Sequence, residues 1–123
     1  MTPKIKIIPL GGLGEIGKNM TAFECGTDII VVDCGLGFPD EQMYGIDIVI
    51  PDISYLKANA DRVRGIILTH GHEDHIGAIP YVMTELDVPI YATPLTAALV
   101  ELKLEEHDLL YNTQIFTKKA GDV

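Results

Sequence analysis

Residues 65–77 read GIILTHGHEDHIG and join an apolar run to a loop of three histidines and two carboxylates. The run 65–69 is apolar and β-branched, which is typical of a buried strand, and Gly71 and Gly77 allow the backbone to turn tightly. Neutral imidazole and carboxylate oxygen hold borderline and hard divalent metals. The segment therefore predicts a ligand loop leaving the end of a strand. It offers two ligand pairs for two metals: His70, His72, Asp74 and His75.

Apolar residues at helical spacing follow this loop, and they predict a helix over 76–86 with Pro80 in its first turn. The helical zinc-protease pattern, two histidines four apart with a glutamate beside the first, is absent, which excludes that class of peptidase. A polar surface loop without a site is the alternative. It is disfavoured because three of the four histidines in the chain cluster here.

Composition predicts one small domain with a core of its own. The chain has 123 residues, 47% of them hydrophobic, and a mean hydropathy of +0.22. No apolar stretch approaches the roughly 20 residues of a membrane span, and residues 1–6 do not form a signal peptide, so we expect a cytoplasmic protein with no membrane association. Cys25 and Cys34 lack metal-ligand spacing and are predicted to be reduced, buried thiols.

The charge is −9, from nine basic and eighteen acidic residues. This sign is opposite to that of a nucleic-acid-binding surface. Bound divalent metals would invert the local field, and a larger protein could carry its basic groove elsewhere. The charge implies only that this segment is not the main contact with nucleic acid.

Strands and helices alternate along the chain without an internal repeat or a linker, which predicts an α/β domain with helices on a mixed sheet. Thr93 and Pro94 are predicted to begin a helix whose inner stripe is Leu95, Ala98, Leu99 and Leu102. The other expected elements are strands at 5–8, 21–25, 29–32, 65–69, 90–92 and 114–118, a tight turn at 26–28 and a short helix at 53–62.

The pattern His-x-His-x-Asp-His after an apolar strand resembles the metal-binding signature of the metallo-β-lactamase superfamily. Residues 11–19 (GGLGEIGKN), 35–40, 45–52 and 104–107 further resemble the bacterial ribonuclease J family of the β-CASP group, so the resemblance covers nearly the whole chain. It implies part of an αββα fold, a mixed sheet flanked by helices. Residues 1–123 would be the N-terminal part of a metallo-β-lactamase domain, without the β-CASP and C-terminal parts.

The resemblance also implies a chemistry. The family hydrolyses RNA phosphodiesters from the 5′ end, favouring 5′-monophosphate ends, and also cuts internally, using two Zn²⁺ ions or Mn²⁺ in the cell. By resemblance, His70 and His72 hold the first zinc, Asp74 and His75 hold the second, and Asp74 and His75 are catalytic, with Asp74 orienting the attacking water. Three further ligands of the family have no matching motif here. The fragment alone is therefore expected to bind zinc weakly and to be inactive, whereas the parent would act as a homo-oligomer or with a paralogous subunit.

Other acidic residues carry further expectations. Asp33 ends an apolar strand and is expected to hydrogen-bond a ligand histidine and fix its tautomer, a role that the resemblance supports; the alternative is that Asp33 satisfies loop amides. Asp40, Glu41, Asp47 and Asp52 share one loop, where solvated acidic side chains are commoner than a calcium site. The resemblance nevertheless points to a structural Ca²⁺ bound by Gly45 and Asp47.

The glycine-rich segment 12–17 matches the dinucleotide-binding fingerprint, with Asp33 about where a ribose-binding acid would lie. The turn at 26–28 leaves no room for a crossover helix, so a hairpin is favoured. The resemblance places this loop beside the metal site, where Asn19 or backbone N–H groups would face a phosphate. His107 is interpreted as an exposed histidine near a helix end and is left out of the site.

Two other functions stay open. One is another metallo-β-lactamase-fold hydrolase, acting on thioesters, lactones or β-lactams, although residues 11–19 and 104–107 argue against it. The other is a non-catalytic partner subunit of an RNA-processing complex. The intact set of four predicted ligands favours an active enzyme.

Overall fold

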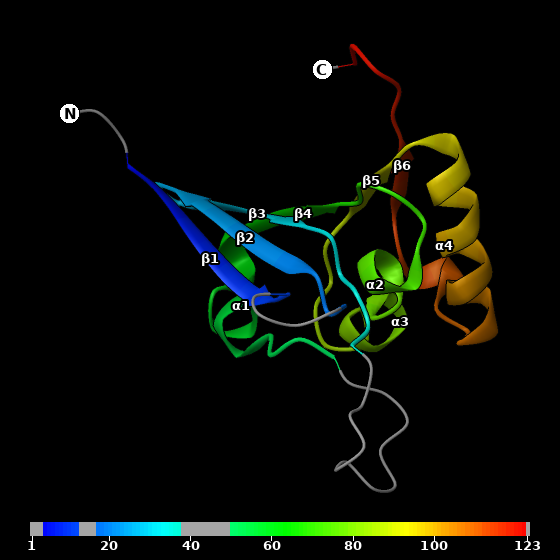
Figure 1. The fold of residues 1–123 in the computed structure, drawn as a ribbon, viewed down its shortest axis with the longest axis horizontal. Coiled ribbons are helices and arrows are strands. Elements are labelled where there is room, and N and C mark those ends of the chain that lie inside the picture. The colour runs from blue at the N-terminus through cyan, green and yellow to red at the C-terminus, as the bar shows by residue number, and fades with distance from the viewer. Residues whose placement is uncertain (1–3, 13–16, 38–49, 123) are drawn as a thin grey trace, which may run out of the picture.

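The fold is known from a computed structural model that describes residues 4–12, 17–37 and 50–122. Its centre is a six-stranded sheet whose strands lie side by side in chain order (Figure 1). The strands are β1 (Ile5–Gly11), β2 (Met20–Cys25), β3 (Asp28–Val32), β4 (Val63–Ile67), β5 (Ile90–Ala92) and β6 (Ile115–Thr117). Antiparallel pairing joins β1 to β2 and β2 to β3, whereas β3 to β6 run parallel. The predicted α/β class with a mixed sheet is confirmed.

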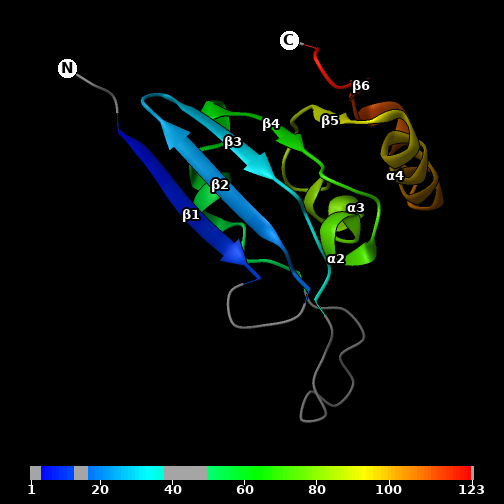
Figure 2. The same ribbon diagram turned by 45° about the horizontal axis from the view of Figure 1, so that its top comes forward.

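A hairpin, and not a crossover helix, follows the first strand (Figure 2). Ile7 pairs with Phe23 in this antiparallel ladder, and Gly26 makes the next turn with φ +61. A dinucleotide site of the expected kind needs a helix that returns the chain to a parallel strand. The fingerprint at 12–17 therefore does not lie in that setting, and the hairpin interpretation is confirmed.

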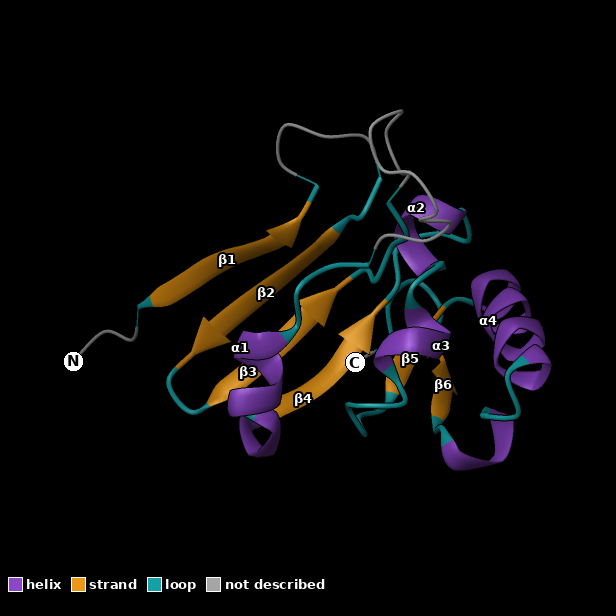
Figure 3. Ribbon diagram, turned by 90° about the horizontal axis from the view of Figure 1, so that it is seen from below, coloured by secondary structure: helices purple, strands orange, loops and turns teal. Residues whose placement is uncertain are grey.

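The helices cover one face of the sheet, and Figure 3 shows α1 and α3 lying over that face. Alternate strand residues such as Ala22, Ile29 and Val31 point into this layer and are fully buried with Leu56 and Ile79 from the helices. The helices are α1 (Ser54–Ala58), η1 (Ala60–Arg62), α2 (Glu73–Ile76), α3 (Ile79–Val82), α4 (Pro94–Glu106) and η2 (Leu110–Asn112). None of the described helices is long and apolar enough to cross a membrane.

The opposite face of the sheet is apolar and exposed. Ile7 and Ile30 lie on either side of the same residue of β2, and Ile67, Tyr91 and Phe116 lie side by side on β4, β5 and β6. All of them occupy the strand positions that alternate with the buried ones. No described element covers this face. Its exposed large residues are Ile5, Ile7, Ile30, Ile67 and Phe116. A sheet with one bare apolar face calls for a further layer, either in the chain or from a partner.

Three sequence predictions are wrong in detail. The helix expected over 76–86 is shorter and begins later: α3 covers only Ile79–Val82, and Ile76 is the last residue of the preceding helix α2. The two helices are separate because the N–H of Ala78 donates to the carbonyl of Cys34, in another segment. Cys25 is exposed, although Cys34 is buried as predicted, and both are free thiols.

The third error concerns α4, which begins at Pro94 as expected but buries a different stripe. Leu95 is 75% exposed and Leu102 is 58% exposed. The buried residues are Thr96, Ala97, Val100 and Leu104. The helix carries two apolar stripes, and the prediction chose the one with more leucines. The stripe that packs on the sheet has smaller residues, which allow closer packing.

A pair of leucines on α4 tests this register. Leu104→Ala is expected to lower the free energy of unfolding by about 2–5 kcal/mol, because it leaves a cavity under a fully buried side chain. Leu102→Ala, the same change on the exposed side of the helix, should cost less than about 0.5 kcal/mol. Urea unfolding of the two variants measures the difference, and equal losses would contradict the register of α4.

Candidate metal centre

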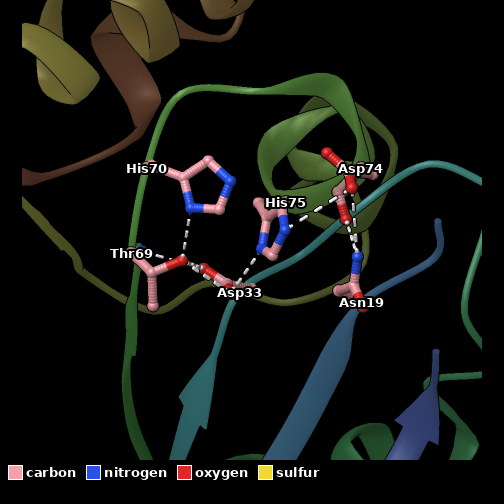
Figure 4. Close-up of polar contacts among 6 residues, drawn as sticks. All are labelled: Asn19, Asp33, Thr69, His70, Asp74 and His75. Carbon is pink, nitrogen blue, oxygen red and sulfur yellow. Dashed lines mark hydrogen bonds and ion pairs between the residues drawn. The ribbon is translucent and has the colours of Figure 1, made fainter. Parts of the chain in front are cut away.

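The predicted ligand loop begins after β4 and continues into α2, so His70 and His72 lie on the loop, whereas Asp74 and His75 lie on the helix. The segment 68–76, called the ligand loop below, lies at the carboxyl end of the parallel strands. Asp33 follows β3, and His70 comes three residues after β4. Because parallel strands end at the same edge of a sheet, the two segments meet although they are far apart in sequence. Figure 4 shows the side chains of Asp33, His70 and His75 converging there.

Three of the four predicted ligands come together. His70, Asp74 and His75 each offer a ligand atom, and these atoms all lie within 4.8 Å of one another. The rings of His70 and His75 have centroids 3.8 Å apart, and Nε2 of His75 lies 3.5 Å from Oδ2 of Asp74. His72 is exposed and stands outside this group, with its ring centroid 4.9 Å from that of His70. The assignment of the four residues to two metals stays a prediction.

Asp33 holds the ligand loop and His75 together. Its Oδ2 lies 2.7 Å from Nδ1 of His75, and its Oδ1 accepts a hydrogen bond of 2.8 Å from the backbone N–H of Thr69. A carboxylate only accepts hydrogen bonds, so Nδ1 carries the proton and Nε2 keeps its lone pair for a metal. Both roles considered for Asp33, orienting a histidine and satisfying a loop amide, are therefore present at once.

The backbone of Asp33 is in the left-handed region, with φ +64, and the residue is only 6% exposed. Aspartate tolerates this conformation better than most residues, but it still costs energy. Strained backbone of this kind is retained where the surrounding structure fixes it, often at functional sites. The turn aims the carboxylate of Asp33 at the loop.

Sequence reasoning missed Thr69, and it placed Asn19 beside the site but with a different partner. The hydroxyl of Thr69 donates to Asp33 and lies 3.1 Å from Nδ1 of His70, so it connects the buried acid to a second predicted ligand. Its signal was a hydroxyl residue directly before the first ligand histidine. Asn19, expected to face a phosphate, instead points its amide at Asp74 (Figure 4).

Cys34 lies beside these residues but is no candidate ligand. Burial raises the pKa of the Cys34 thiol far above its ordinary value, and the neighbouring Asp33 raises this pKa further. The thiol is therefore protonated near neutral pH and a poor nucleophile. It is also not among the described side chains whose ligand atoms converge. Its role is to fill space behind the site.

A second charged cluster has a structural role. The buried carboxylate of Glu24 accepts a hydrogen bond from the Tyr55 hydroxyl and lies 3.2 Å from Nη2 of Arg62 and 3.6 Å from Nζ of Lys6. The hydrogen bond from Tyr55, followed by the charge of Arg62, holds the pKa of Glu24 below its ordinary value. The cluster ties β2 to α1 and η1, at the other end of β3 from Asp33.

The remaining predicted residues lie apart from this centre. Gly45 and Asp47, the expected calcium ligands, lie outside the described residues together with Asp40 and Glu41. Asp52 is described, and its Oδ1 accepts hydrogen bonds from the Ser54 side chain and backbone, which lower the pKa of Asp52. Calcium binding therefore stays a prediction.

His107, which was left out of the site, is exposed and donates from Nδ1 to the carbonyl of Lys103 over 3.0 Å. Its ring packs edge-on against Tyr81, with the ring centroids 5.4 Å apart. These contacts belong to the end of α4. They give His107 a local structural role.

A comparison with protein families matches residues 13–118 to the metallo-β-lactamase superfamily. The chain belongs to this superfamily. Similarity to individual proteins narrows the relationship: the chain is 54% identical over 105 residues to ribonuclease J of Helicobacter pylori, covering 85% of this chain and 15% of that protein. It is also 54% identical over 106 residues to ribonuclease J2 of Bacillus subtilis, covering 86% and 19%. The resemblance to ribonuclease J inferred from the motifs is confirmed.

The fold agrees with solved members of the metallo-β-lactamase superfamily. The crystal structure of YhfI, a metallo-β-lactamase fold protein from Bacillus subtilis, superposes with a TM-score of 0.58 at 19% identity, covering 98% of this chain and 48% of that one. The chain spans about a fifth or less of the length of the ribonuclease J relatives given above.

The fold of the metallo-β-lactamase superfamily implies a divalent metal, and the residues present fit one. His70 and His75 offer imidazole nitrogen, Asp74 offers carboxylate oxygen, and Asp33 leaves Nε2 of His75 as the free donor. This mixture of nitrogen and oxygen donors suits borderline metals such as zinc and manganese.

Proposed function

We propose that the whole protein carrying this chain is a metal-dependent ribonuclease. It hydrolyses RNA phosphodiesters in RNA maturation and decay, removes nucleotides from the 5′ end with a preference for 5′-monophosphate ends, and also cuts internally. The observation that carries the proposal is the identity of about half the aligned residues to ribonucleases J. The convergence of His70, Asp74 and His75, whose ligand atoms lie within 4.8 Å of one another, supports it.

Each ligand residue has a proposed role. His70 and His72 hold one Zn²⁺ and Asp74 and His75 hold another, with Mn²⁺ as the alternative in the cell. When bound, two such ions lower the pKa of water towards neutrality and stabilise charge that develops on phosphate oxygen. Asp33 keeps His75 in the tautomer that presents Nε2. The Asp74 carboxylate accepts a hydrogen bond from the attacking water and so orients it towards phosphorus.

The rest of the site is proposed to come from the longer protein. Residues 1–123 would form the N-terminal part of a metallo-β-lactamase domain, and a further histidine, a bridging aspartate and a late histidine would complete the ligand sets. The bare apolar face of the sheet supports a second layer from that remaining chain or from a partner. The isolated chain would then bind zinc weakly and be inactive. We also propose that the protein is cytoplasmic and that Gly45 and Asp47 bind calcium. The whole protein would assemble as a homo-oligomer or with a paralogous subunit.

An RNA labelled in turn at each end tests the proposal. The whole protein is expected to release mononucleotides stepwise from the 5′ end, faster from a 5′-monophosphate than from a 5′-triphosphate. Because both ions supply the chemistry, a chelator should stop the reaction, and adding back Zn²⁺ or Mn²⁺ in separate samples shows which metal restores it. Uncleaved RNA in the presence of bound metal would reject the ribonuclease, and would favour a non-catalytic partner subunit or another hydrolase.

A further inference from the structure

Asn19, at the end of the loop between β1 and β2, contacts Asp74. The backbone N–H of Asn19 lies 3.2 Å from the carbonyl oxygen of Asp74, and Nδ2 of Asn19 donates to the same oxygen over 2.9 Å. The same Nδ2 lies 3.5 Å from Oδ2 of the Asp74 carboxylate (Figure 4). Asn19 and Asp74 are 55 residues apart in sequence, so this contact is made by the fold and not by a local turn.

The orientation of the Asn19 amide is fixed from both sides. Its nitrogen faces two oxygens of Asp74, which only the NH₂ end of an amide can do. The Oδ1 end of the side-chain amide lies so near Gly12 that a Cβ there would come within 2.8 Å of it. The backbone carbonyl of Asn19 accepts a hydrogen bond of 3.0 Å from the N–H of Gly35, which fixes the main chain at this residue. The side chain is partly buried between these neighbours.

This arrangement does not suit a phosphate ligand. An amide has two N–H donors, and those of Asn19 point towards the carbonyl and the carboxylate of Asp74. The remaining polar atom of the side chain is Oδ1, an acceptor, which would repel phosphate oxygens. The amide of Asn19 is therefore turned towards Asp74 and is not offered to a substrate.

Oδ2 of Asp74 lies 3.5 Å from the Asn19 amide and 3.5 Å from Nε2 of His75. We propose that Asn19 is a positioning residue for the proposed ribonuclease: its amide fixes the backbone and the carboxylate of Asp74 so that this oxygen stays next to His75. Residues that hold a ligand in this way typically change metal affinity by about 10–100-fold when they are replaced. Only the expected change in the kinetics of RNA cleavage rests on the proposed function; the expected change in metal affinity does not.

Asn19→Asp in the whole protein is the sharpest test, because it keeps the size of the side chain and replaces the NH₂ donor by an oxygen facing the oxygens of Asp74. Affinity for Zn²⁺, measured against a competing chelator, is expected to fall by about 10–100-fold. The visible absorption spectrum of the Co²⁺-substituted protein should change, because the ligand geometry changes. With 5′-monophosphate RNA, kcat should fall while KM stays the same, since Asn19 does not touch the substrate.

Asn59→Asp is the matched control. Nδ2 of Asn59 also donates to a backbone carbonyl, that of Tyr55, over 2.9 Å. Asn59 also accepts from Arg62, which reaches the Gly26 turn, at the opposite end of β3 from Asp33. This variant should leave zinc affinity and the cobalt spectrum unchanged even where it lowers the melting temperature.

Two outcomes would overturn the proposal. Unchanged zinc affinity with a raised KM would mean that Asn19 contacts the RNA, and unchanged affinity with unchanged kinetics would mean that it positions nothing. If Asn19→Asp does not fold, Asn19→Ala replaces it, since it removes the donor without adding charge, and the same readouts apply. Absence of RNA cleavage by the unaltered protein would reject the proposed function, whereas the zinc and cobalt arms would still decide the role of Asn19.

Discussion

Replacing His75 with alanine is expected to reduce RNA cleavage by the whole protein at least about a hundred- to a thousandfold, the loss typical of removing one group that stabilises transition-state charge. His75 is the residue through which the other contacts of the site act. Its Nδ1 is 2.7 Å from Asp33, its Nε2 is 3.5 Å from Asp74, and its ring lies beside that of His70. Alanine removes the proposed ligand and deprives the buried carboxylate of Asp33 of one of its hydrogen-bond partners, Thr69 being the other.

The measurement pairs the rate of 5′-monophosphate RNA cleavage with the zinc content of the purified protein. His107→Ala is the matched control, because it removes an exposed histidine that contacts Lys103 and Tyr81 and no residue of the metal centre. That variant should keep both zinc and activity. If the His75→Ala protein has the zinc content and the cleavage rate of the unaltered protein, His75 is not a ligand and the proposed assignment is wrong.

The location of the site was predictable because its signal is local. Strand, turn glycine, histidines and carboxylate follow one another within residues 65–77, and the structure keeps them together in space. Asp33 was predictable as a residue at a strand end near the site, although its bond to His75 spans 42 residues. Thr69 and Asn19 act through contacts whose partners no spacing rule identifies. A residue that bridges distant segments was therefore predictable only where, as for Asp33, its place at a strand end already marked it.

The break between α2 and α3, which delays the start of the helix predicted over 76–86, has the same origin. Within one continuous helix, the N–H of Ala78 would donate to the carbonyl of Asp74. In the structure, Ala78 N–H donates instead to the carbonyl of Cys34, over 3.0 Å, and the Asp74 carbonyl accepts from Asn19. Cys34 N–H in turn donates to the carbonyl of His75. Apolar spacing correctly predicted which side chains are buried: Ile76, Ile79, Val82 and Leu86. It holds no information about which backbone groups bond to one another, so it did not predict the break.

Gly35→Ala is expected to lower the free energy of unfolding by about 3 kcal/mol, the upper end of the usual cost of overpacking, and to abolish metal binding. A Cβ at this position would come within 1.7 Å of the carbonyl oxygen of Asp74 and 2.9 Å of the backbone nitrogen of Asn19. Both atoms belong to backbone and cannot rotate away as a flexible side chain could. The strand end after β3, the first loop and the ligand loop would have to separate, and Asp74 would lose its place beside His75.

Gly26→Ala separates this steric effect from the general cost of replacing a glycine. Gly26 has φ +61, and a Cβ added there would meet no described atom within 4 Å, so alanine should cost about 1 kcal/mol through backbone strain and leave the site intact. Urea unfolding and zinc titration of both variants give the comparison. A Gly35→Ala protein that unfolds like Gly26→Ala and still binds zinc would show that the three segments do not need their close approach. If Gly35→Ala loses zinc binding and Gly26→Ala keeps it, the metal centre depends on the close contact among these three backbone segments.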